Sequence, residues 1–76
     1  MLKHTLDITT EVCPMTYVRT KLRLEPLAEG ELLEVLIRGS EPLKNLPRSA
    51  REEGHQVVSL EPLPDGVHRL TLRKGP

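Results

Sequence analysis

Stretches in which apolar and polar residues alternate recur along this 76-residue chain, and a period of two is typical of half-buried strands. They predict strands over residues 4–8, 31–38, 56–63 and 67–73. Between the last two strands, the turn-forming sequence Leu63-Pro64-Asp65-Gly66 predicts a hairpin. We therefore expect four strands, the last two of them antiparallel neighbours.

The segments that separate the first three strands have helical spacing instead. A first helix is expected over residues 15–27, with Pro26 and Gly30 marking its end. A second helix is expected over residues 41–53, where Pro47 should force a kink or an irregular start. The residues expected on the inward face of the first helix are Tyr17, Thr20, Leu24 and Leu27.

The resulting element order is β-α-β-α-β-β. Each strand has one apolar face and one largely polar face, which indicates a sheet covered by helices on one side only. Right-handed crossovers place both helices on that side. The predicted fold class is α/β: a two-layer sandwich of a four-stranded mixed sheet with two helices on one face, in a single domain over residues 1–76. We expect a monomer, although an exposed last strand could pair edge to edge with another copy.

Composition excludes several classes of function. Eleven basic and eleven acidic residues cancel, and Tyr17 is the only aromatic residue, which argues against direct nucleic-acid binding. No apolar run is long enough for membrane insertion, and the N-terminus has no signal-peptide pattern. Three histidines and one cysteine lack metal-ligand spacing, so neither a metal nor another cofactor is expected. A single unpaired cysteine suits a reducing, cytoplasmic location.

The dipeptide Cys13-Pro14 is the strongest candidate for chemistry. Proline is well placed at the first position of a helix, because its missing N–H has no intrahelical partner there. The Cys13 sulfur would then face the unpaired backbone N–H groups and the positive end of the helix dipole. These surroundings favour the thiolate, which is the nucleophilic form of cysteine.

The three histidines, which are the other candidates for chemistry, are interpreted as structural residues. His4 and His68 could both lie on the helix-facing side of the sheet, where they would be structural histidines rather than a general base for Cys13. His55 follows Gly54 in a turn and is expected to be exposed.

Several motifs together resemble the TusA/SirA-like sulfur-carrier family. They are His4-Thr5-Leu6-Asp7 before Cys13-Pro14, Gly30-Glu31 closing the first helix, and the ending Arg73-Lys74-Gly75. The resemblance covers nearly the whole chain, and the predicted element order is also that of the family.

This resemblance implies a persulfide carrier. Cys13 would accept a sulfane sulfur from a donor protein, such as a cysteine desulfurase or a rhodanese-like protein, or from thiosulfate. It would then pass the sulfur to a downstream acceptor protein. The destinations that the resemblance leaves open are tRNA thiolation, cofactor sulfuration and thiosulfate use.

Two positions depart from the family pattern. The second proline of the family signature is replaced by Thr16 in Cys13-Pro14-Met15-Thr16, a segment expected to belong to the docking face. The acidic stretch common after the second strand is here Arg38-Gly39-Ser40. If that loop lies near Cys13, Arg38 would favour an anionic donor or an acidic partner surface.

Basic residues of the first helix are further candidates for partner binding. Lys21 aligns with a basic position of the family. Together with Arg19 and Arg23 it forms either a docking patch for an acidic partner or an ordinary solvated helix face.

Two other functions stay open. A stand-alone small sulfurtransferase would turn over thiosulfate repeatedly without a partner protein. A non-catalytic interaction module would have a buried Cys13 with a normal or raised pKa.

Overall fold

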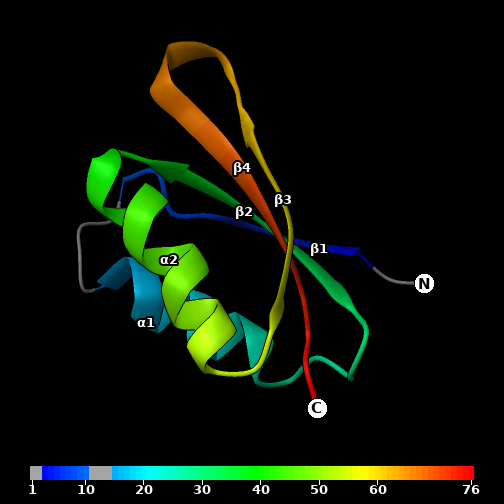
Figure 1. The fold of residues 1–76 in the computed structure, drawn as a ribbon. Coiled ribbons are helices and arrows are strands. Elements are labelled where there is room, and N and C mark those ends of the chain that lie inside the picture. Colours follow the sequence, from blue (N-terminus) through cyan, green and yellow to red (C-terminus); the bar gives the residue numbers. More distant parts are fainter. Residues whose placement is uncertain (1–2, 11–14) are drawn as a thin grey trace.

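A computed structural model describes residues 3–10 and 15–76 of the chain. The elements are β1 (Lys3–Asp7), α1 (Met15–Leu24), β2 (Leu32–Arg38), α2 (Ser40–Glu52), β3 (Gln56–Pro62), the short 3₁₀ turn η1 (Pro64–Gly66) and β4 (Val67–Arg73). The order β-α-β-α-β-β is thereby confirmed. Figure 1 shows both helices on the same face of the sheet, so the predicted two-layer α/β sandwich is also confirmed.

The sheet is mixed, with the strand order β1-β2-β4-β3. β1 pairs in parallel with β2, and β4 pairs antiparallel with both β2 and β3. The expectation that the last strand could pair with another copy is wrong, because β4 lies inside the sheet with a hydrogen-bonded strand on each side. The strands at the edges are β1 and β3.

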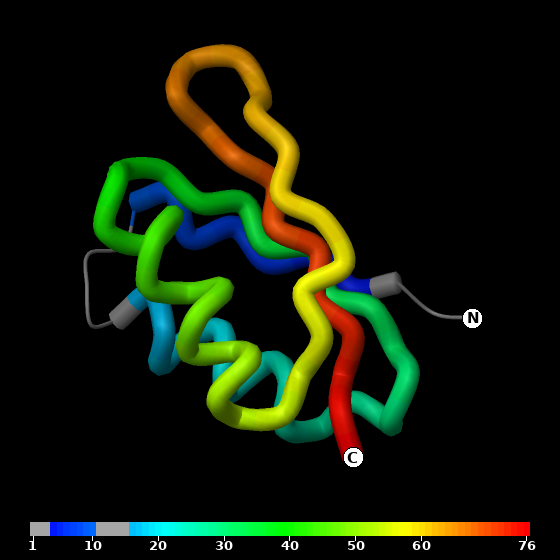
Figure 2. The backbone as a smooth tube through the Cα atoms, in the orientation of Figure 1, coloured from blue at the N-terminus to red at the C-terminus, as the bar shows by residue number. Residues whose placement is uncertain are grey.

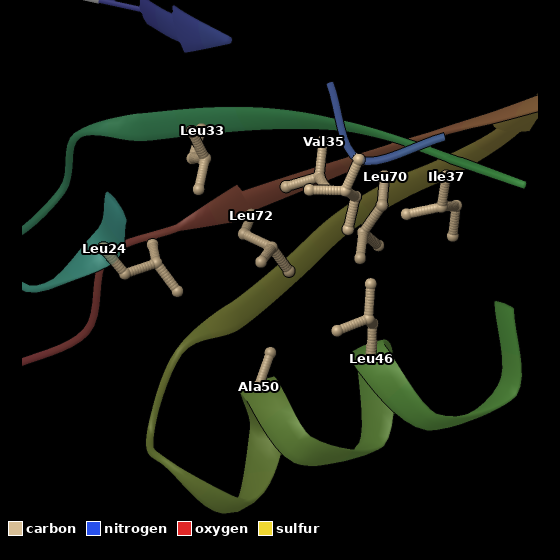
Figure 3. Packing of buried hydrophobic residues seen from close by; sticks show 9 residues of the cluster. Leu24, Leu33, Val35, Ile37, Leu46, Ala50, Leu70 and Leu72 are labelled. Atoms are coloured by element: carbon tan, nitrogen blue, oxygen red, sulfur yellow. The ribbon is translucent and has the colours of Figure 1, made fainter. Parts of the chain in front are cut away.

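The core lies between the sheet and the helices and is built from aliphatic side chains. In β2, Leu33, Val35 and Ile37 are fully buried and alternate with partly exposed residues, as their spacing predicts. Tyr17 packs against this cluster from its edge, in agreement with its expected core role. Among the described residues, the buried hydrophobic side chains that form this core, shown in Figure 3, are Ile8, Leu24, Leu33, Val35, Ile37, Leu46, Ala50, Leu70 and Leu72.

Proline affects the two helices differently. α1 ends at Leu24, three residues before the predicted boundary, because the residue before Pro26 is disfavoured in helical conformation. α2 instead continues without a break through Pro47 to Glu52. Pro47 is buried, and the stabilisation from this burial offsets the loss of the backbone hydrogen bond that proline cannot donate. Within the described part of the chain, neither helix is long and apolar enough to cross a membrane.

The C-terminal residues fold back on the end of α2. The Gly75 N–H donates a 3.0 Å hydrogen bond to Nδ1 of His55, and Gly75 is itself buried. The prediction of an exposed His55 is therefore wrong, since its ring is partly covered by this tail. Burial, with a smaller contribution from the charge of Lys74, holds the pKa of His55 below its ordinary value.

Candidate functional site

The first two strands and both helices meet at one end of the sheet. β1 and β2 are parallel, so their carboxyl ends, Asp7 and Arg38, lie at the same edge. α1 begins at Met15 and α2 at Ser40, and Figure 2 shows both starts gathered at this edge. We call this region the carboxyl end of the sheet. Cavities that bind ligands in open α/β sheets lie at such ends.

Part of the predicted sulfur site lies outside the residues that the structure describes. Cys13 and Pro14 belong to residues 11–14, which lie outside the described residues. Thr9 and Thr10 precede that segment, and Met15 follows it as the first residue of α1. The surroundings of the carboxyl end are therefore given by the neighbouring residues that the structure does describe.

Asp7 provides a fixed negative charge at the carboxyl end, which the sequence analysis missed. Its Oδ1 accepts hydrogen bonds from the backbone N–H of Thr9 at 2.9 Å and from the Thr9 hydroxyl at 2.8 Å. These two bonds, the backbone one first, lower the pKa of Asp7, and the charge of Arg38 lowers it slightly further. The spacing of Asp7 and Thr9 is that of an Asx turn and could have revealed this arrangement.

Arg38 adds a positive charge at the same end and links it to the β3–β4 turn. Its guanidinium donates a hydrogen bond to the backbone carbonyl of Asp65. Asp65 has a positive φ of 64° and is followed by Gly66, and the Arg38 guanidinium lies directly beside that glycine. Because its charge also acts on Asp7, Arg38 belongs to the electrostatic surroundings of the carboxyl end.

The first turn of α1 carries no acidic residue. The first four N–H groups of a helix lack intrahelical partners, so an anion near this start is favoured unless carboxylates already occupy it. Thr16 lies in this turn and is only 1% exposed, so it faces the core rather than the surface. Its carbonyl accepts a 2.8 Å hydrogen bond from the hydroxyl of Thr20, one turn further along the buried side.

The basic residues of α1 are exposed but connected to their neighbours. Lys21 Nζ lies 3.8 Å from a carboxylate oxygen of Glu53, just beyond α2. Arg23 donates a 3.2 Å hydrogen bond to the carbonyl of Thr5 in β1. Both groups of the Lys21–Glu53 pair are about half exposed, and such pairs contribute roughly 0–1 kcal/mol to stability. These side chains therefore present positive charge to solvent and contribute little to the stability of the fold.

Two exposed aliphatic side chains of α1 were also missed. Val18 is 40% and Leu22 is 58% exposed. They stand two residues after the buried Thr16 and Thr20, and residues two apart on an α-helix point about 200° apart. The same helical spacing that identified the inward face could have found this outward pair.

The two histidines expected on the helix-facing side are both placed there by the strand register. His4 pairs with Leu33 and His68 with Ile37, and both partners are core residues. His4 Nε2 lies 3.3 Å from a carboxylate oxygen of Glu31, which gives it a structural partner at the end of the sheet opposite to Asp7.

A shallow pocket lies at that opposite end as well. It has a volume of about 250 Å³ and is lined by residues such as Gly30, Gly54, Arg73 and Lys74. The pocket is thus separate from the carboxyl end of the sheet.

Comparison with known proteins bears directly on this arrangement. A family model described as sulfurtransferase TusA matches residues 4–74, which is nearly the whole chain. A candidate sulfur carrier protein of Archaeoglobus fulgidus is 41% identical over 69 residues, covering 91% of this chain and 78% of that protein. Another from Methanocaldococcus jannaschii is 43% identical over 69 residues, covering 91% of each chain.

The fold has a solved counterpart. The crystal structure of a SirA-like protein from Desulfitobacterium hafniense superimposes with a TM-score of 0.84 at 29% sequence identity. The superposition covers 99% of this chain and 100% of the other. The resemblance drawn from the sequence motifs is therefore confirmed at the level of both sequence and fold.

Proposed function

Because the chain belongs to the TusA family of sulfurtransferases, we propose that it is a sulfur carrier, which holds a sulfane sulfur on Cys13 as a persulfide and passes it to a partner protein. The observation that carries this proposal is the family match across residues 4–74, which includes the only cysteine of the chain. Partners of two kinds are required: a sulfur donor, which is a cysteine desulfurase, a rhodanese-like protein or thiosulfate, and an acceptor protein. A reducing cytoplasm would keep a lone thiol available for this role.

The transfer step balances without an added oxidant or cofactor. The Cys13 thiolate attacks the outer sulfur of a donor persulfide R–S–SH, a new S–S bond forms, and the donor S–S bond breaks. The products are Cys13–S–SH and the thiolate R–S⁻, which leaves with the electron pair of the broken bond. With thiosulfate the leaving group is sulfite. The acceptor protein attacks the outer sulfur in the same way and restores the Cys13 thiolate.

The described residues around the carboxyl end suit an anionic sulfur. α1 begins two positions after Cys13, and its first turn has no carboxylate to compete for the free N–H groups. A helix N-terminus stabilises an exposed anion by about 0.3–1 kcal/mol. The charge of Asp7 opposes a thiolate, and Arg38 counteracts that charge.

The other site residues are assigned supporting roles. Proline is favoured at the start of a helix, and this preference is the role proposed for Pro14. Met15 and Thr16 belong to the first turn of α1. Since Thr16 is buried, its contribution is to hold this turn against the core rather than to touch a partner. Lys21 and Arg38 provide positive charge for a partner or an anionic donor.

Loading of sulfur on Cys13 can be measured by mass spectrometry of the intact protein. After incubation with thiosulfate, or with a cysteine desulfurase and cysteine, we expect the mass of one added sulfur atom, removable by reductant. The Cys13→Ala variant should gain none, because the chain has no other cysteine. No adduct from either donor, together with slow alkylation of Cys13, would indicate an interaction module instead. Repeated turnover without any partner protein would indicate a stand-alone sulfurtransferase.

Arg38→Glu is expected to slow loading from thiosulfate by a few-fold, because it replaces the positive charge that balances Asp7 with a second negative one. Arg38→Gln distinguishes the effect of the charge from that of the hydrogen bond, because glutamine is uncharged but can still donate to the Asp65 carbonyl. We expect an intermediate rate for Arg38→Gln and a smaller difference between all three proteins at high salt. Equal loading rates for wild type and Arg38→Glu at low salt would refute this role of Arg38.

A further inference from the structure

The strand β4 carries two arginines on the face of the sheet that the helices leave uncovered (Figure 1). Arg69 and Arg73 are four residues apart, so their side chains lie on the same side of the strand. Arg69 Nε lies 3.2 Å from a carboxylate oxygen of Glu61, which balances its charge. Arg73 instead donates a 3.0 Å hydrogen bond to the side-chain oxygen of Gln56, a neutral amide. The positive charge of Arg73 is therefore not balanced by this partner.

Arg73 lines the shallow pocket at the end of the sheet opposite to the carboxyl end. The volume of this pocket is about 250 Å³, slightly below the range of roughly 300–1,000 Å³ that is usual for sites of small molecules. Its ligand must therefore be small. The pocket is lined mainly by glycines and by polar or charged residues, so an apolar ligand does not fit it.

Glycine backbone forms a large part of the pocket lining. Gly30, Gly54 and Gly75 belong to three separate segments of the chain. Hydrogen bonds hold these segments side by side (Figure 2), from Gly30 N–H to the Lys74 carbonyl at 2.9 Å and from Gly75 N–H to His55 at 3.0 Å. A Cβ at Gly30 or Gly54 would meet no atom within 4 Å, so the space beside both residues is open. A ligand can approach the main chain closely at such positions.

The charged side chains of the pocket favour an anion. Arg73 and Lys74 contribute two positive charges, whereas Glu29 contributes one negative charge. A guanidinium group has five N–H donors, so the single hydrogen bond to Gln56 leaves Arg73 with donors for a ligand. Arginine binds carboxylate and phosphate groups through two parallel hydrogen bonds, and lysine binds them as a point charge.

We propose that this pocket binds a small oxyanion, namely the phosphate or carboxylate group of a small metabolite, with Arg73 and Lys74 as its binding residues. The pocket lies at the other end of the sheet from Asp7 and Arg38, so the proposal does not depend on sulfur transfer. A ligand that binds only the folded state stabilises it, so the bound anion would also stabilise the C-terminal segment that lines the pocket.

Titration with inorganic phosphate, followed by nuclear magnetic resonance of the backbone amides, measures this binding. The experiment uses the full chain at a pH of about 8, where His55 is neutral, and sodium chloride keeps the ionic strength constant. We expect the amide signals of Gly30, Gly54 and Gly75 to shift and to reach a plateau. Sodium acetate in place of phosphate tests the carboxylate group at the same three signals.

Arg73→Gln has a matched control in Arg69→Gln. Both arginines lie on the same face of β4, but Arg73 lines the pocket and Arg69 is paired with Glu61. We expect Arg73→Gln to raise the Kd for phosphate about five-fold or more, because a charge-assisted hydrogen bond is lost. The control removes the same net charge and should leave the Kd nearly unchanged. Circular dichroism melting curves show whether both variants fold.

Three further variants test the charges around Arg73. Gln56→Glu gives Arg73 a carboxylate partner like that of Arg69, so it should raise the Kd although Arg73 itself is kept. Lys74→Gln keeps both backbone hydrogen bonds of this residue and should also raise the Kd. Glu29→Gln removes the negative charge and should lower the Kd. Loss of structure would raise the Kd in every variant, so the opposite effect of Glu29→Gln identifies an electrostatic cause.

Every other outcome overturns the proposal. Shifts that grow linearly with phosphate, or that are equal in wild type and Arg73→Gln, would show only general effects of the salt. Shifts confined to the carboxyl end of the sheet would place the anion there instead. Weaker binding by Glu29→Gln together with tighter binding by Arg73→Gln would show that the pocket prefers cations. None of these results changes the loading of sulfur, so the proposed carrier function is tested separately.

Discussion

Leu70→Ala is expected to lower the free energy of unfolding by about 2–5 kcal/mol, as for other leucines removed from a packed core. Leu70 is fully buried in the interior strand β4, between Val35 of β2 and Leu60 of β3. Figure 3 shows it facing Leu46 of α2 across the layer interface. Domains of this size have a total stability of about 4–11 kcal/mol, so this single change would remove a large share of it.

The measurement is urea unfolding followed by far-UV circular dichroism. Leu60→Ala is the matched control, because Leu60 is the cross-strand neighbour of Leu70 but is 40% exposed on an edge strand. We expect this control to cost clearly less than Leu70→Ala. If both changes cost the same, the helix-facing side of β4 is not the centre of the core.

Gly75→Ala is expected to displace the C-terminal tail. A Cβ at this position would clash with the Gly54 carbonyl oxygen, which is a backbone atom rather than the end of a flexible side chain. Moving the tail breaks the hydrogen bond from Gly75 N–H to His55, which is worth about 1 kcal/mol. For a domain of this size that loss corresponds to a fall of roughly 4–8 °C in melting temperature.

The same variant should change the titration of His55. In the wild type the folded state holds the pKa of His55 below its ordinary value, mainly through burial of the ring. The folded state therefore binds this proton less readily than the unfolded state does. Its contribution to stability is complete above a pH of about 6.5 and declines as the pH falls from there through the lowered folded pKa.

Displacement of the tail exposes the ring, so the His55 pKa in Gly75→Ala should rise toward its ordinary value. Nuclear magnetic resonance titration of the imidazole measures this directly, and unfolding at pH 8 and pH 5 measures the accompanying change in stability. Pro76→Ala, at the exposed last residue, is the control. An unchanged His55 titration in Gly75→Ala would contradict the proposed contact.

Local sequence patterns predicted the helices and strands well, but not all of their boundaries or the order of the strands in the sheet. The predicted strand pair at the C-terminus is present, yet its order in the sheet was not foreseen. Which strand of a hairpin lies inside depends on contacts with β2, which is distant in sequence. Pro62 and the irregular register near Val58 are typical of an edge strand, and Pro62 was already visible in the sequence.

The two prolines inside helical patterns also show that a local pattern cannot predict every helix boundary. Pro26 ended α1 early, whereas Pro47 was accommodated within α2. The difference follows from burial, because the ring of Pro47 packs into the interior and Pro26 is exposed. Periodicity cannot tell these situations apart, since both prolines break the local pattern in the same way.

For the candidate site, the sequence by itself determined the lone cysteine before a helix, the family motifs, the inward faces of the strands and the layered fold. These features depend on neighbours a few residues apart, so a local pattern contains them. Only the tertiary structure decided that Arg38 acts on Asp7, that Thr16 is buried and that His55 receives the C-terminal tail. Such contacts join residues from different elements, and their positions follow from strand order and packing, which no local spacing specifies.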